Sequence, residues 1–352
     1  MLHRSRVRTF TGPGGEHRAE RVGNWIKAVD GHEAATAWCA ENGVALTKAA
    51  SETTNVAGGY LAPPDFDAAI ISVVEAMGAF RQGAEIRPAR SDGQVRPRRT
   101  GGATATFIAE GAPIPESNLQ FDAVGTTQKK LGILLRSSAE LFEDTAADLA
   151  KFLTFEIGYA IATREDDCGF NATGTSAFAG ISGLASKLVG MKSSVAAGTG
   201  ANTFLTLTAT DITNLMGGVL ATAIPGAAFY TSATGYAQTI CRLAAVSGGL
   251  VATMRPDGTI AASFLGHPVH FSGKLPDVST SLTGSAMLFF GNLSQSSVIV
   301  ERQPETVIAI SRERAMDADQ VLVRGVRRLD IVNHSIGDAN TRGSVAMLVG
   351  TA

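Results

Sequence analysis

The chain has 352 residues, a formal net charge of −2 and a hydrophobic content of 45%, of which few residues are aromatic. This composition is typical of a loop-rich globular protein with room for two or three core-bearing units, and it excludes fibrous and disordered classes. The longest apolar stretches, such as 217–230, are too short to cross a membrane, so no membrane partner is expected. The polar, arginine-rich start excludes a secretory signal, which predicts synthesis in the cytoplasm.

Three cysteines, Cys39, Cys168 and Cys241, lie far apart in the chain. An odd number without paired spacing argues against a disulfide framework. We expect small buried side chains in a reducing compartment.

Residues 1–57 are predicted to form an N-terminal arm. Apolar residues from Val22 to Val29 recur at helical spacing and include Trp25 and Ile26. This face packs either on the chain's own body or on a neighbouring subunit, and Trp25 and Ile26 are therefore candidate inter-subunit contacts. The arm also begins with basic residues that are either solvated charge or face nucleic acid by non-specific contact. These candidate DNA-facing residues are Arg4, Arg6 and Arg8.

Residues 65–85 predict a helix, whereas residues 86–130 are rich in Arg, Gly, Thr and Pro. Short alternating pieces at 104–108 and 121–126 predict a long two-stranded excursion with a turn-rich tip. Such an excursion cannot bury much of its own surface, which points to a partner. A basic stretch runs through this region: Arg81, Arg87, Arg90, Arg96, Arg98 and Arg99. The candidate inter-subunit contacts here are Arg96, Arg98, Arg99, Glu110 and Glu116.

Residues 131–203 begin with an alternating strand and continue into the most clearly periodic helix of the chain, which is expected to end near Asp167. Capping-box spacings at Ser137-x-x-Glu140 and Thr145-x-x-Asp148 predict the helix starts. A third such spacing, at Thr208, opens a new unit. Helices and strands then follow without βαβ regularity, which indicates an α+β fold.

Sequence motifs for catalysis are missing. There is no phosphate loop, dinucleotide-binding fingerprint or nucleophile elbow. His267 and His270 would point to opposite faces of a strand, so no metal site is expected. The acidic run 165–167 stands at the expected helix end, where the macrodipole disfavours carboxylates. It is either a strained acid site or a salt-bridged end, with a cation from another subunit as one option. We assign no catalytic residue, cofactor or metal.

Four landmarks follow one another in a fixed order, and together they resemble the Hong Kong 97 family of tailed-phage major capsid proteins. They are Gly58-Gly59-Tyr60-Leu61-Ala62-Pro63-Pro64, Glu110-Gly111-Ala112-Pro113-Ile114-Pro115-Glu116-Ser117, Lys129-Lys130-Leu131 and Ser138-Ala139-Glu140-Leu141-Phe142-Glu143-Asp144. The resemblance runs from about residue 58 to the end.

The resemblance implies a Hong Kong 97-like fold. Its parts would be the arm at 1–57, a peripheral domain with a long spine helix, an extended loop, an axial domain and closing strands that return to the peripheral domain. The expected boundaries are 58–85 and 131–203 for the peripheral domain, 86–130 for the loop, 204–310 for the axial domain and 311–352 for the closing strands.

The implied function is structural. Copies would form hexamers and pentamers of an icosahedral head shell around packaged double-stranded DNA. Implied partners are portal and scaffolding or protease proteins, with the protein located in the virion after assembly in the bacterial host cytoplasm. An encapsulin-like nanocompartment that encloses a cargo enzyme is the alternative, and a hydrolase using Glu165 or Asp166 is a third reading.

Two departures from the family pattern stand out. Only about 57 residues precede the first landmark, so scaffolding is a separate protein or the sequence is a processed or variant form. The type member welds its shell through a loop lysine, yet residues 49–128 contain no lysine. We therefore expect no cross-link from the extended loop.

Overall fold

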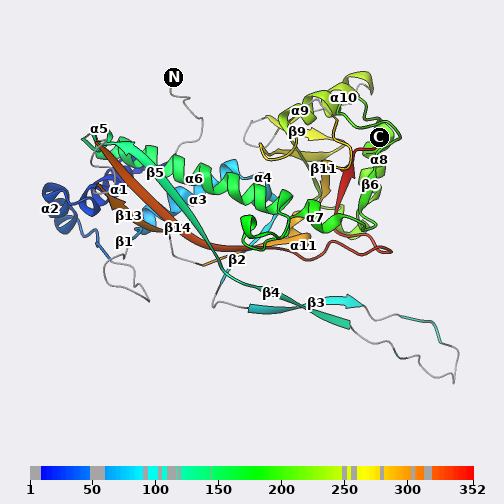
Figure 1. The fold of residues 1–352 in the computed structure, drawn as a ribbon, viewed down its shortest axis with the longest axis horizontal. Helices are drawn as coiled ribbons and strands as arrows, with labels where there is room; N and C mark the ends of the chain where they lie inside the picture. The colour runs from blue at the N-terminus through cyan, green and yellow to red at the C-terminus, as the bar shows by residue number, and fades with distance from the viewer. Residues whose placement is uncertain are drawn as a thin grey trace.

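The structure is a computed structural model. It describes residues 9–47, 60–89, 94–101, 105–108, 116, 120–143, 145–247, 252–254, 260–277, 281–302, 306–312 and 319–352. Figure 1 shows an elongated molecule with two lobes and a narrow hairpin that projects from between them. One lobe surrounds the long helix α6 (Ala146–Asn171), and the other surrounds a compact group of strands.

The first lobe is built on what we call the long sheet. Among the described residues it has six strands, and β14 is its central member. β14 pairs antiparallel with β5 from Gln320↔Ser138 to Leu329↔Lys129 and with β12 and β13 on its other edge. The strands are β1 (Tyr60–Leu61), β2 (Glu85–Pro88), β5 (Lys129–Ser138), β12 (Ser297–Glu301), β13 (Val307–Ser311) and β14 (Gln320–Asn333).

Helices cover one face of the long sheet. Leu153, Ile157 and Ile161 on α6 are fully buried and pack with Val321 and Val323 of β14 in one core. This confirms the predicted apolar stripe, although α6 continues to Asn171 instead of ending near residue 167. The other helices of this lobe are α1 (Gly15–Val29), α2 (Glu33–Glu41), α3 (Pro64–Met77), α4 (Ala79–Gly83) and α5 (Ala139–Glu143).

The start of α6 shows where capping spacing predicted correctly and where it did not. Thr145 takes the N-cap position of α6, as predicted, but its side chain accepts no capping hydrogen bond from the helix. Ser137 lies within β5, paired with Val321, so its capping-box prediction is wrong. At Ser137, ten-residue pairing of β5 with β14 is more stable than a local helix cap.

The second lobe contains what we call the compact sheet, with seven strands in the described residues. β7 lies between a parallel neighbour, β10, and an antiparallel one, β11, which is the mixed pattern of an α+β fold. Its strands are β6 (Ser194–Ala196), β7 (Ala228–Thr231), β8 (Ala252–Met254), β9 (Ile260–Phe264), β10 (His267–Phe271), β11 (Ala286–Gly291) and β15 (Val345–Val349).

Short helices surround the compact sheet. Helix α8 (Ala209–Gly217) begins with the predicted capping box, because the Thr208 side chain accepts from the Asp211 N–H while Asp211 accepts from the Thr208 N–H. The remaining helical segments are η1 (Ser176–Phe178), α7 (Leu184–Leu188), η2 (Ala221–Ala223), α9 (Ala233–Gly235), the π-helix η3 (Tyr236–Cys241), α10 (Arg242–Ser247) and α11 (Leu293–Ser296).

A shared core joins the two lobes. Phe80 of α4 meets Phe170 at the end of α6 in a T-shaped contact with ring centroids 5.2 Å apart. Phe170 also contacts Tyr230 of β7 and Phe289 of β11. Long-helix and compact-sheet residues therefore belong to one continuous apolar cluster.

Sheet membership differs from the expected domain boundaries. β12 lies within the expected axial domain, 204–310, and β13 exceeds that range by one residue. Both strands nevertheless pair with β14 in the long sheet. β15 falls inside the range 311–352, yet it pairs with β11 and β6 in the compact sheet. The chain thus crosses between lobes more often than expected, because strand partners are set by non-local pairing that local periodicity does not reveal.

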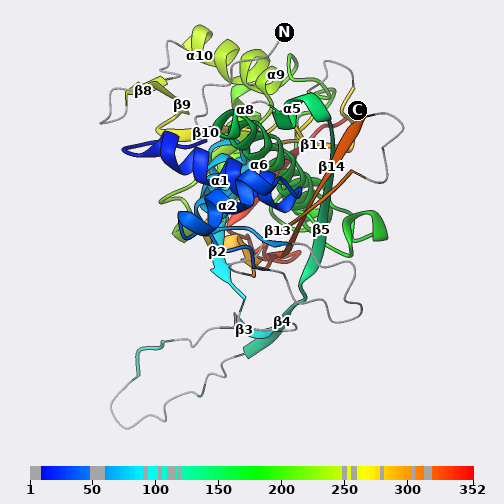
Figure 2. The same ribbon diagram turned by 90° about the vertical axis from the view of Figure 1, so that its left-hand side faces the viewer.

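The projecting hairpin consists of β3 (Gln94–Gly101) and β4 (Gln120–Thr126). The two strands pair antiparallel from Gln94↔Thr126 to Gly101↔Gln120. Both views show it extending away from the two lobes (Figures 1 and 2). The two-stranded excursion was predicted, and its second strand was placed correctly. The first strand lies earlier than the expected 104–108, where residues 105–108 have no strand structure.

Candidate functional site

The histidines and cysteines that the sequence analysis considered lie apart from one another. His267 and His270 lie on β10 with separate partners, the Ala227 carbonyl and the Gln82 side chain. No cluster of three or more possible metal ligands occurs within the described ranges. No helix in those ranges is both long and apolar enough to cross a membrane. Cys39, Cys168 and Cys241 are free thiols, and burial raises the pKa of Cys168 to about 11.

The acidic run on α6 is part of a buried charge cluster inside the chain. Arg81 of α4 donates to both carboxylate oxygens of Glu165 at 3.2 Å and to both of Glu301 on β12 at 3.1 and 3.0 Å. Arg327 of β14 donates to Glu301 at 2.8 Å. Two arginines thus balance two glutamates, and the counter-cation that we considered from another subunit comes from this chain.

Burial explains why this cluster holds the lobe together. The side chains of Arg81, Glu165 and Glu301 are at most 1% exposed. Desolvation acts to lower the pKa of Arg81, but the two carboxylates outweigh it and raise that pKa, so the guanidinium stays charged. Asp166, the next residue, accepts the Phe80 N–H at 2.9 Å and the Ser272 hydroxyl at 2.6 Å. The cluster is structural, and the basic stretch found in the sequence begins with a buried arginine, Arg81.

Trp25 and Ile26 are not available as inter-subunit contacts in this structure. Both are at most 1% exposed, and Trp25 lies 6.1 Å from Phe66 of α3 between ring centroids. The backbone of α1 touches α6 so closely at Gly23 that a Cβ there would lie 1.8 Å from the Ala146 carbonyl oxygen. The predicted apolar face exists, but it packs on the chain's own body.

The other predicted contact residues are only partly described by the structure. Arg96, Arg98 and Arg99 lie on β3. Glu116 is exposed beyond β3, and so is Phe107, while Glu110 lies outside the described residues. Arg4, Arg6 and Arg8 also lie outside them. The structure therefore brings the hairpin arginines together on one strand, apart from both lobes.

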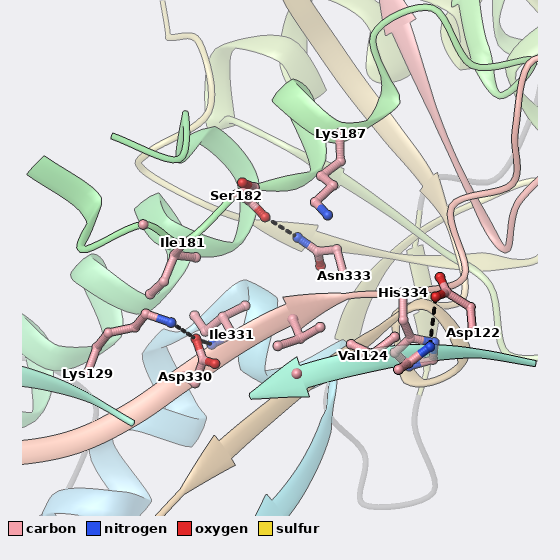
Figure 3. Close-up of a pocket in the computed structure, with 14 residues that line it drawn as sticks. Asp122, Val124, Lys129, Ile181, Ser182, Lys187, Asp330, Ile331, Asn333 and His334 are labelled. Atoms are coloured by element: carbon pink, nitrogen blue, oxygen red, sulfur yellow. Dashed lines mark hydrogen bonds and ion pairs between the residues drawn. The ribbon is translucent and has the colours of Figure 1, made fainter. Parts of the chain in front are cut away.

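The base of the hairpin holds a second polar site that sequence reasoning missed. Asp330 of β14, which is 2% exposed, accepts the Thr127 backbone N–H at 2.8 Å and the Lys129 ammonium at 3.0 Å. Figure 3 shows Asp330 and Lys129 at one end of a crevice of about 340 Å³, with Lys187 and Asn333 further along. Asp330 is the one acidic residue of β14, and that was the signal available in the sequence.

Comparisons with known proteins agree with this architecture. The sequence model of the phage capsid family matches residues 58–334. No curated protein matches the chain. A solved chain from the capsid of an empty GTA particle is 18% identical, with a TM-score of 0.55, and the match covers 89% of this chain and 98% of that one.

Two phage structures are similar in the same way. The chain from Microbacterium phage Oxtober96 is 14% identical with a TM-score of 0.54, and the match covers 78% of this chain and 91% of that one. The chain from Mycobacterium phage Bobi is 15% identical with a TM-score of 0.53 and the same two coverages, 78% and 91%. These likenesses confirm the Hong Kong 97-like α+β fold, and the family match favours a phage shell over an encapsulin-like one. Because the family match spans most of its length, the chain belongs to the phage capsid family and is a structural, non-enzymatic shell protein of a virion.

Proposed function

We propose that copies of this chain form hexamers and pentamers that close the icosahedral head shell of a tailed phage or prophage around double-stranded DNA. Contacts that repeat between different surface patches of identical chains close into rings and then shells. The lobe around α6 would be the peripheral domain, and the lobe around the compact sheet would be the axial domain near the capsomer centre.

The observation that supports this proposal is the isolated β3–β4 hairpin. Within the described residues its strands pair only with each other and join neither sheet. A lone two-stranded hairpin is marginally stable in water, so it requires a second surface. A neighbouring copy supplies that surface in our proposal, with Arg96, Arg98 and Arg99 meeting acidic groups on it.

Further partners follow from the same proposal. Portal and scaffolding or protease proteins would act with the shell during assembly in the bacterial host cytoplasm. Arg4, Arg6 and Arg8 would contact packaged DNA non-specifically, and such contact should weaken as salt rises.

Reversing the hairpin charge tests the proposal. In a variant with Arg96→Glu, Arg98→Glu and Arg99→Glu, we expect a normal circular dichroism spectrum and unfolding midpoint but loss of particles on a sedimentation gradient. The matched control replaces the same three residues with Lys, which preserves the charge and should preserve particles. Normal particles from the Glu variant would contradict the role of these arginines.

A further inference from the structure

The direction of the hairpin depends on a small number of contacts at its base. The β5–β14 ladder ends at Lys129↔Leu329, and β4 ends at Thr126. Residues 127 and 128 therefore connect the hairpin to the long sheet without belonging to either ladder. A two-residue connection of this kind permits rotation unless side chains restrain it.

Asp330 supplies that restraint. Its Oδ2 accepts the Thr127 N–H at 2.8 Å, and its Oδ1 accepts the Lys129 Nζ at 3.0 Å. Beyond the end of the β5–β14 ladder, the Thr127 N–H therefore donates to the Asp330 side chain and not to a backbone carbonyl of β14. Because Asp330 is 2% exposed and ionic hydrogen bonds are stronger than neutral ones, this contact turns the chain out of the sheet at a fixed point.

On the other side of the hairpin, a backbone bond holds the last described residue after β2. The Ala89 N–H, directly after β2, donates to the Glu301 carbonyl at 2.8 Å. This bond extends the parallel pairing of β2 with β12 by one residue. In the described part of the chain, a backbone bond therefore holds the end of β2 and a side chain holds the connection to β5. A single substitution at Asp330 can remove the side-chain contact.

Open space lies beside the hairpin base. The crevice of about 340 Å³ has residues 122–125 of β4 on one side and residues 180–182 with Lys187 on the other. Asn333 braces the far wall by donating to the Ser182 carbonyl at 3.0 Å. In Figure 3, β4 runs along the crevice below Asn333 while Lys187 approaches from the opposite side. A hairpin freed from Asp330 has room to swing toward α7.

We propose that Asp330 is a positioning residue that sets the direction in which the β3–β4 hairpin leaves the body. It acts through the Thr127 amide and the Lys129 ammonium. The consequence for assembly rests on the proposed function, because direction decides where the hairpin meets a neighbouring copy. The restraint itself is a property of the single chain.

Hydrogen exchange tests the restraint before assembly. In the full-length Asp330→Asn variant, the acceptor keeps one oxygen but loses its charge, so we expect exchange at the Thr127 amide to rise by about 10-fold. Lys129→Met keeps the Thr127 bond, should raise exchange less, and serves if the Asn variant fails to fold. Asp30→Asn is the matched control. The Asp30 side chain is 2% exposed, against 3% for Asp330, and it pairs with Arg312 away from the hairpin.

A distance measurement tests direction itself. Spin labels at Phe107→Cys, beyond β3, and at Tyr159→Cys on α6 are both at exposed positions. In a Cys241→Ala background, the distance between them reports the direction of the hairpin. Asp330→Asn should broaden the distance distribution, while Asp30→Asn should leave it unchanged. Equal broadening in both variants, or none in either, would overturn the proposal. Because both experiments use unassembled chain, failure to form particles would count against the proposed function and not against the role of Asp330.

Discussion

Arg81 and Glu301 form an ion pair in the core, in which one guanidinium nitrogen of Arg81 donates to both carboxylate oxygens of Glu301 at 3.1 and 3.0 Å. Each side chain is 1% exposed. The two residues are separated by 220 positions in the chain. The pair ties α4, at the junction of the lobes, to β12 of the long sheet. Removing one partner of such a pair leaves the other charge buried without compensation.

Arg81→Met should therefore lower the free energy of unfolding by about 3–5 kcal/mol. Denaturant unfolding of the unassembled chain measures this loss. Arg87→Met is the control, because Arg87 pairs with Glu85 at a site where its side chain is 40% exposed. Exposed pairs contribute little, so this control should change stability by about 1 kcal/mol or less. Equal losses for the two variants would contradict a specific role for burial.

Asp211 should make stability depend on acid pH. Burial acts to raise the pKa of Asp211, but hydrogen bonds from Thr208 and the Gly198 N–H outweigh it and lower that pKa. A lowered pKa means that the unfolded chain takes up the proton first. The stabilisation is thus fully present above the ordinary range for aspartate, about pH 4, and is lost as the pH falls through the lowered value.

Comparison with Asp211→Asn isolates this effect. At pH 7 the variant should be less stable by about 1.5–3 kcal/mol, and the gap should narrow as the pH falls below about 4. Asp148→Asn is the matched control, because Asp148 holds the corresponding position at the start of α6 and its side chain is 71% exposed. Its loss of stability relative to the original chain should be smaller. A gap for Asp211→Asn that does not vary with pH would rule out this linkage.

Gly23→Ala should loosen the N-terminal helices from the body. The added Cβ would meet the Ala146 carbonyl oxygen at 1.8 Å, so α1 must shift away from α6. Overpacking of this kind costs about 1–3 kcal/mol. Both tryptophans of the chain, Trp25 and Trp38, lie in α1 and α2, so a red shift of tryptophan fluorescence reports the movement.

Gly132→Ala provides the comparison for that variant. Gly132 lies on β5, and a Cβ there would have no atom within 4 Å. Its fluorescence and stability should stay close to those of the original chain. If Gly23→Ala behaved in the same way, the tight packing of α1 on α6 would be wrong.

Assembled particles should show no covalent ladder from the hairpin. An amide cross-link to an Asn or Asp needs a lysine amine, and residues 49–128 contain no lysine. A denaturing gel of purified particles should give one band at the mass of the single chain. A ladder whose cross-linked peptides map to residues 86–128 would refute this prediction.

Local patterns in the sequence predicted elements better than their partners. The apolar periodicity of α6 and the Thr208 capping box depend on neighbouring residues, and the structure confirms both. The sheets to which β12 and β15 belong depend on pairing with distant strands, and the expected boundaries missed both. Periodicity shows that a strand exists but not which neighbour completes its hydrogen bonds.

The same limit applies to the candidate site residues. Arg81 looked like part of a basic surface because its partner Glu165 lies 84 positions away. Trp25 and Ile26 showed an apolar face, but only the fold decides whether such a face meets the chain itself or another copy. The sequence assigned no contact to Asp330, because its role depends on the register that brings Thr127 beside it.

The central claim, that this chain builds a closed shell, is tested most directly by negative-stain electron microscopy of the chain expressed alone and separated on a sedimentation gradient. Our account predicts closed particles or capsomer rings of six and five copies. A well-folded species that stays monomeric, even when the products of the neighbouring genes are added, would contradict it.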